Sequence, residues 1–202
     1  MYADGYLSDT TPYSKYVGIT LSSKDREHLE KFNSSINSNY QIRDYEVVKG
    51  YKIGSPYSRI IITSEKMYQD LILQGCVPHK TNGIKPPLIG FDFDRHFIRG
   101  YLDGDGSISR CLKKGKFTKF PKYEYQIKIL GTIEILDYIK DFIENNNVAT
   151  IRHYFQRKPN QKVHSLEFGG NKQVKKFLDI IYANATVYLS RKYDRYLDLC
   201  KQ

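Results

Sequence analysis

RHFIRGYLDGDGSIS, residues 95–109, begins with apolar residues at helical spacing and continues into two aspartates that alternate with glycines. The spacing predicts a helix over Arg95–Leu102 and a strand from about Ser107 onward. The glycines give the backbone the freedom that a turn between these two elements requires. Asp103 and Asp105 should therefore lie together at the C-terminal end of a helix.

Two carboxylates at this end of a helix are unfavourable by several tenths of a kcal/mol, because the helix dipole is already negative there. We expect a cation to compensate, and a divalent metal bound by Asp105 and the Gly104 carbonyl together with phosphate oxygens is one candidate. The alternative is a glycine-capped helix followed by a solvated aspartate turn. An EF-hand is excluded, because Ser107 and Lys114 stand at the fifth and twelfth positions of that loop.

The chain also contains an internal repeat. Residues 19–43 are echoed by residues 127–152, each time as an alternating strand, an amphipathic helix, an Asn-rich turn and a new strand. Residues 59–76 are echoed in the same way by residues 165–184, as a strand followed by a helix. The nearly constant offset between the members of each pair indicates one unit written twice. The two copies are expected at residues 1–87 and 91–202.

The stretch Ile98–Gly106, IRGYLDGDG, resembles the LAGLIDADG motif of homing endonucleases, with Gly100 at the small-residue position where two motif helices pack. The first copy carries the end of such a motif: Asp4 aligns with Asp105, and Tyr2 stands in place of the earlier acid. Only three residues precede Asp4, so we expect the first copy to lack most of its motif helix.

This resemblance implies an α+β fold of two pseudo-symmetric αββαββα halves, whose saddle-shaped antiparallel sheets lie in the major groove of DNA. It also implies a site-specific double-stranded DNA homing endonuclease, in which Asp4 and Asp105 hold Mg²⁺ or Mn²⁺ where the halves meet. Members of the family place a basic residue near each metal, and Lys80 and Lys192 are the candidates. The alternative is that Lys80 and Lys192 are ordinary surface lysines without a catalytic role.

Charge supports a nucleic-acid partner. The chain has 32 Lys and Arg against 22 Asp and Glu, a formal net charge of +10, which favours a polyanion. We expect a monomer on a long, nearly asymmetric duplex target; the alternative is association promoted by the missing first motif helix. The predicted DNA-binding residues are Lys15, Lys49, Lys52, Arg59, Arg110, Lys113, Lys114, Lys116, Lys119, Lys122, Lys128, Arg152, Arg157 and Lys158.

Other classes of protein fit less well. The three cysteines are far apart and match neither a zinc site nor a disulfide framework. There is no long apolar run and no signal-peptide pattern, so we expect a soluble intracellular protein, from a bacterial or phage cytoplasm or an organelle. The alternative function is a catalytically inactive DNA- or RNA-binding protein, a maturase or transcriptional regulator. A scaffold that binds no nucleic acid explains neither the charge nor the motif.

Overall fold

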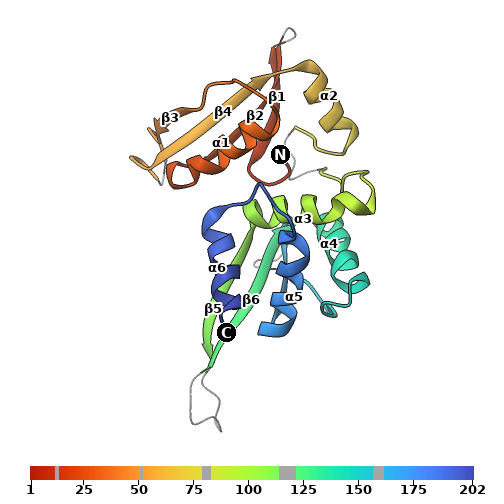
Figure 1. The fold of residues 1–202 in the computed structure, drawn as a ribbon. Helices are drawn as coiled ribbons and strands as arrows, with labels where there is room; N and C mark the ends of the chain where they lie inside the picture. Colours follow the sequence, from red (N-terminus) through yellow and green to blue (C-terminus); the bar gives the residue numbers. More distant parts are fainter. Residues whose placement is uncertain (12–13, 51, 79–82, 114–121, 157–161) are drawn as a thin grey trace. The chain divides into compact units, whose positions relative to one another are not determined.

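The computed structural model describes residues 1–11, 14–50, 52–78, 83–113, 122–156 and 162–202. The chain divides into two compact units, Met1–Leu88 and Ile89–Gln202 (Figure 1). Each unit contains a four-stranded antiparallel sheet, in the order β1-β2-β4-β3 in the first and β5-β6-β8-β7 in the second. The two units therefore share one strand topology.

The first unit buries one face of its sheet beneath two helices. Leu7, Val17 and Ile60 alternate with more exposed residues along their strands, and this period of two places them together on the covered face. Ser64 caps the second helix by accepting a hydrogen bond from the Met67 amide at 3.2 Å. The elements are β1 (Gly5–Thr11), β2 (Ser14–Ser22), α1 (Arg26–Ser35), β3 (Arg43–Glu46), β4 (Pro56–Thr63) and α2 (Glu65–Leu73).

The second unit has a larger apolar core. Ile127 and Ile129 on the sheet, and Leu136, Ile139 and Phe177 on the covering helices, are completely buried. The helical residues recur every three or four positions, which gives each helix one apolar face. The elements are α3 (Phe91–Asp105), β5 (Gly106–Lys113), β6 (Lys122–Gly131), α4 (Ile133–Asn145), β7 (Phe155–Gln156), β8 (His164–Gly169), α5 (Asn171–Tyr182) and α6 (Ser190–Cys200).

The predicted α+β class is confirmed. The second unit follows the order αββαββα and then adds α6, whereas the first unit follows ββαββα. The residues described before Gly5 form no helix, as expected from the short stretch ahead of Asp4. The helix predicted over Arg95–Leu102 extends further in both directions, to Phe91 and Asp105.

The strand register corrects the alignment of the repeat. Gly5 pairs with Ile19 in the first unit, and Gly106 pairs with Ile129 in the second, so Ile19 corresponds to Ile129 and not to Ile127. A shift of two residues leaves every side chain on the same face of the strand. The hydrophobic pattern alone therefore could not detect the error.

Candidate nucleic-acid interface and acidic motif

The face of the first sheet that its helices leave open carries a basic and aromatic surface. Arg59 points to this open face because its neighbour Ile60 is completely buried on the other side. Arg43 lies directly across from Arg59 in the neighbouring strand. The Arg59 guanidinium is 4.7 Å from the centre of the Tyr45 ring, which stacks on Tyr57 with ring centres 5.4 Å apart. We call Arg43, Tyr45, Tyr57 and Arg59 the arginine–tyrosine surface.

The two arginines of this surface converge on one phenol. Hydrogen bonding from Arg59, and then from Arg43, lowers the pKa of the Tyr45 hydroxyl. Two guanidinium groups in one small region of an open sheet present many donors to an anion or to the acceptor edge of a base. This surface therefore suits both phosphate binding and base reading.

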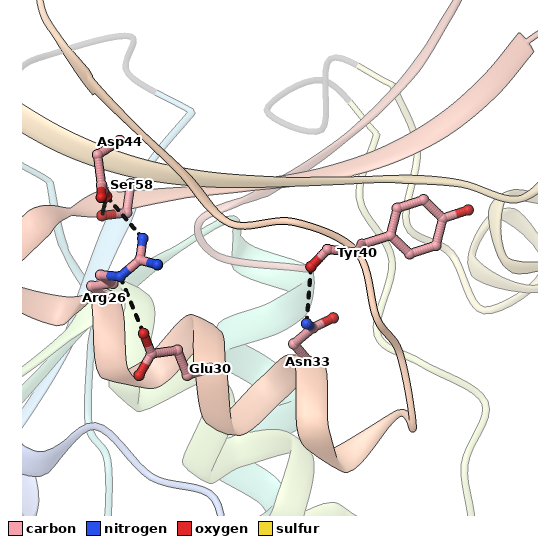
Figure 2. Close-up of polar contacts among 6 residues, drawn as sticks. All are labelled: Arg26, Glu30, Asn33, Tyr40, Asp44 and Ser58. Atoms are coloured by element: carbon pink, nitrogen blue, oxygen red, sulfur yellow. Dashed lines mark hydrogen bonds and ion pairs between the residues drawn. The ribbon is translucent and has the colours of Figure 1, made fainter.

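Contacts on the covered side fix the edge strand that carries half of this surface (Figure 2). Asp44 accepts a hydrogen bond from the Ser58 hydroxyl at 2.6 Å and one from Arg26 at 2.9 Å. Arg26 also contacts Glu30 on its own helix, with 3.1 Å between the Arg26 Nε and Glu30 Oε1. Because Asp44 is held toward α1, its neighbours Arg43 and Tyr45 must point to the open face.

The open face of the second sheet has a different composition. Lys128 and Glu167 are paired across neighbouring strands with 2.5 Å between Nζ and Oε1. Lys113 contacts Glu124 at 3.1 Å, and Lys122 stands opposite Lys113 in the register. Two of its lysines, Lys113 and Lys128, are therefore paired with carboxylates, in contrast to the arginines and tyrosines of the first unit.

The acidic motif lies at the end of α3, where its two aspartates have different environments. Asp103 is only 3% exposed, and it accepts hydrogen bonds from the Tyr182 hydroxyl at 3.1 Å and from the Leu189 amide at 2.9 Å. Burial, followed by the negative charge of Asp103, raises the pKa of Tyr182, so this phenol stays protonated and donates. Asp105 is the last residue of the helix and is partly exposed.

Lys192 supplies a positive charge at this helix end. Its ammonium donates to the carbonyl oxygens of Leu102, Asp103 and Gly106, each at 2.6 Å, and the residue is only 4% exposed. The last carbonyls of a helix have no partner within the helix and carry its partial negative charge. Lys192 therefore provides the cation that the sequence predicts at this position.

A stripe of charged residues on α3 contacts the end of α5 and the segment that follows it, and sequence reasoning missed this stripe. Arg99 donates to the carbonyls of Val187 at 2.9 Å and Ile181 at 3.0 Å. Arg95, Arg99 and Asp103 are four residues apart and so share one face of the helix. Their regular spacing of four residues was the available signal.

No protein-family model and no curated protein sequence matches this chain. Solved structures match over nearly all of it. The meganuclease I-SmaMI, solved on uncleavable DNA, aligns with 99% of this chain and 86% of its own length, at a TM-score of 0.62 and 12% identity. The I-LtrWI LAGLIDADG homing endonuclease, bound to target DNA, aligns with 98% of this chain and 86% of its own length. Its TM-score is 0.63 and its sequence identity is 13%. This chain has the LAGLIDADG homing endonuclease fold.

Within the LAGLIDADG fold, Asp4 and Asp105 occupy the same place in their respective units. Each stands directly before the glycine that opens the first strand of its sheet, Gly5 in one case and Gly106 in the other. Asp4 is exposed, and it follows residues that form no helix. The equivalence of these two acids, inferred from the sequence, agrees with the topology of both units.

The residues predicted to contact DNA fall into three groups. Arg59, Lys113, Lys122 and Lys128 lie on the open faces of the sheets. Lys49 and Lys52 are exposed between β3 and β4, and Arg152 is exposed ahead of β7. The predictions at Lys114, Lys116, Lys119, Arg157 and Lys158 lie outside the described residues, as does the catalytic candidate Lys80.

Two predicted DNA-binding positions need correction. Lys15 shares the covered side of β2 with Val17, and its ammonium is 2.8 Å from Glu65 on α2, so it is not on the open face. Arg110 points to the same side as the buried Tyr125, with its guanidinium 3.8 Å from the Tyr123 ring centre. Lys192, a predicted catalytic residue, lies at the acidic motif, where its buried ammonium donates to three carbonyls, and its catalytic role stays a prediction.

A divalent cation fits this motif only as a site shared with another molecule. The described residues contain no group of three or more His, Cys, Asp or Glu side chains that could hold a metal. Asp105 and the backbone at Gly104 offer one carboxylate and one carbonyl, which suits Mg²⁺ when phosphate and water complete its coordination. A similar structure, I-SmaMI bound to its uncleaved DNA target, was solved in the presence of calcium ions and has a TM-score of 0.61.

Within the described residues no helix is both long and apolar enough to span a bilayer.

Proposed function

We propose that this chain is a site-specific endonuclease that hydrolyses phosphodiester bonds of double-stranded DNA with the help of Mg²⁺ or Mn²⁺. The observation that carries the proposal is the equivalent placement of Asp4 and Asp105 ahead of two like-built sheets with open faces. The proteins that share this fold were solved with target, uncleaved and cleaved DNA. The net charge of +10 is consistent with the same partner.

Each part of the chain has a distinct task in this proposal. Asp105 and the Gly104 carbonyl would hold a cation against a DNA phosphate, and Asp4 would do so in the first unit. When bound, that cation activates water and stabilises the leaving oxygen. Lys192 offsets the negative end of α3, so that the Asp105 carboxylate is tolerated there.

The two open faces are expected to recognise different sequences. Arginine reads guanine in the major groove through two hydrogen bonds, and Arg59 is already oriented by Tyr45. The second unit instead presents Gln126 and Lys128 from β6, and glutamine pairs favourably with adenine. We therefore propose that one copy of the chain binds a long target whose two halves differ.

Neutralising the arginine–tyrosine surface should weaken duplex binding in a salt-dependent way. Replacing Arg43 and Arg59 together by Gln should reduce the slope of log K against log[salt] by up to about 1.8, since each phosphate contact contributes about 0.9. The measurement is a fluorescence anisotropy titration of a duplex at several salt concentrations.

Matched controls, used singly and then combined so that the same two charges are lost, alter the covered side of the same unit. Lys66→Gln alters an exposed lysine on α2, and Lys15→Gln alters the lysine that pairs with Glu65. Both should leave the slope unchanged. An equal loss of slope in these controls would show that only net charge matters, and tighter binding to single-stranded RNA than to duplex would favour the maturase alternative.

A further inference from the structure

We infer that Asp103, the first acid of the motif, is a positioning residue and not a metal ligand. It fastens the start of α6 to the end of α3, so that Lys192 caps the helix that carries Asp105. The inference rests on the proposed function only for the task of Asp105. The fastening itself is a property of the DNA-free chain.

Both carboxylate oxygens of Asp103 are already used. Oδ1 accepts from the Tyr182 hydroxyl and Oδ2 from the Leu189 amide, in a site where the residue is 3% exposed. Each oxygen keeps a second lone pair, but at 3% exposure the carboxylate is almost inaccessible to the phosphate and water that complete a Mg²⁺ site. Asp105 is partly exposed at the helix end, where a cation that also binds a DNA phosphate can approach it.

The two ends of the fastening are rigidly connected. Leu189 is the N-cap of α6, and its carbonyl accepts a hydrogen bond from the Lys192 amide at 2.9 Å. One helical turn therefore separates the amide that Asp103 holds from the lysine that caps α3. Asp103 sets where α6 begins, and the first turn of α6 sets where the Lys192 ammonium lies.

The first unit fills the same position with a residue of different chemistry. Tyr2, which aligns with Asp103, donates its hydroxyl to the Gln74 carbonyl and packs against the core cluster that includes Cys76. Cys76 in turn aligns with Tyr182, at the same offset as Arg59 and Ser165. The second unit thus has the carboxylate of Asp103 and the phenol of Tyr182 where the first unit has the phenol of Tyr2 and the thiol of Cys76. A protonated phenol is a poor ligand for Mg²⁺, which favours a structural task for this position in both units.

The test separates hydrogen bonding from charge at Asp103. Asp103→Asn keeps an acceptor for the Leu189 amide and can donate to Tyr182, so the fastening should survive. Asp103→Ala removes both bonds. Hydrogen exchange in the DNA-free chain should speed up about tenfold or more at residues 102–107 and 189–193 in the Ala variant, and stay within about twofold of the original chain in the Asn variant.

Cleavage assays then distinguish positioning from metal binding. Asp103→Asn should need the same Mg²⁺ concentration for half-maximal cutting as the original chain, whereas Asp103→Ala should need more. Unchanged exchange in Asp103→Ala, or loss of cutting in Asp103→Asn as complete as in Asp105→Asn, would overturn the inference. If the Ala variant does not fold, Lys192→Met breaks the same connection from α6 and must loosen residues 102–107.

A failure of the proposed function would look different. A chain that neither binds nor cuts duplex DNA would still show the exchange pattern, because that pattern is measured without DNA. The inference about Asp103 would then stand as a structural one, and only the task assigned to Asp105 would fall.

Discussion

Asp105→Asn should lower the rate of Mg²⁺-dependent duplex cutting by about 100-fold or more, equivalent to about 2.7 kcal/mol of lost transition-state stabilisation. Asparagine has nearly the size of aspartate but lacks the negative charge that a hard cation requires. Duplex affinity without metal should be retained or rise slightly, since a carboxylate near phosphate is removed. Single-turnover cleavage and anisotropy titrations measure the two quantities separately.

The control for this variant is Asp141→Asn, which makes the same substitution at an exposed position of α4. It should cut at the original rate. A second readout is the strengthening of duplex binding by Ca²⁺, which should disappear in Asp105→Asn and persist in the control. If Asp105→Asn cuts as fast as the original chain, the metal site is assigned wrongly and the inactive binding protein becomes the better account.

Lys192→Met should lower the free energy of unfolding of the second unit by about 1–3 kcal/mol, the usual cost of leaving buried acceptors without their donor. Methionine retains the apolar stem but leaves the carbonyls of Leu102, Asp103 and Gly106 without the ammonium. Urea unfolding monitored by tyrosine fluorescence measures the change, at constant m-value.

Lys176→Met provides a matched comparison. Lys176 also donates to a backbone carbonyl, that of Asn147 at 3.0 Å, but this contact is exposed. The substitution should cost less than about 1 kcal/mol, because water can replace the lost bond. Equal losses in the two variants would contradict the claim that burial makes Lys192 a structural cap.

The sequence predicted the architecture well because the fold depends on periodic patterns. Strand alternation and helical spacing placed both copies of the unit, and the glycines around Asp105 located the junction of helix and strand. The two-residue error in the repeat arose at the second strand, where an even shift preserves the pattern of buried residues. Only the pairing of Gly5 with Ile19 and of Gly106 with Ile129 resolved it.

The site was predicted less completely, because net charge says nothing about the direction in which a side chain points. Lys15 and Arg110 seemed equivalent to Arg59 in the sequence, yet the pleat places them on the covered side. Arg43 was missed because only the pairing of β3 with β4 places it beside Arg59, and the sequence does not show that pairing. The sequence predicted a compensating cation at the end of α3, with a divalent metal as the candidate, and it could not reveal that the Lys192 ammonium lies there.

The most direct test of this account is a selection from a library of random duplex DNA. The chain is incubated with the library in Ca²⁺, bound duplexes are sequenced, and the enriched duplex is then exposed to Mg²⁺. We predict one long enriched sequence with two dissimilar halves, cut in both strands only when Mg²⁺ is present. Retention of all duplexes without sequence preference, together with no cutting of any of them, would contradict the account.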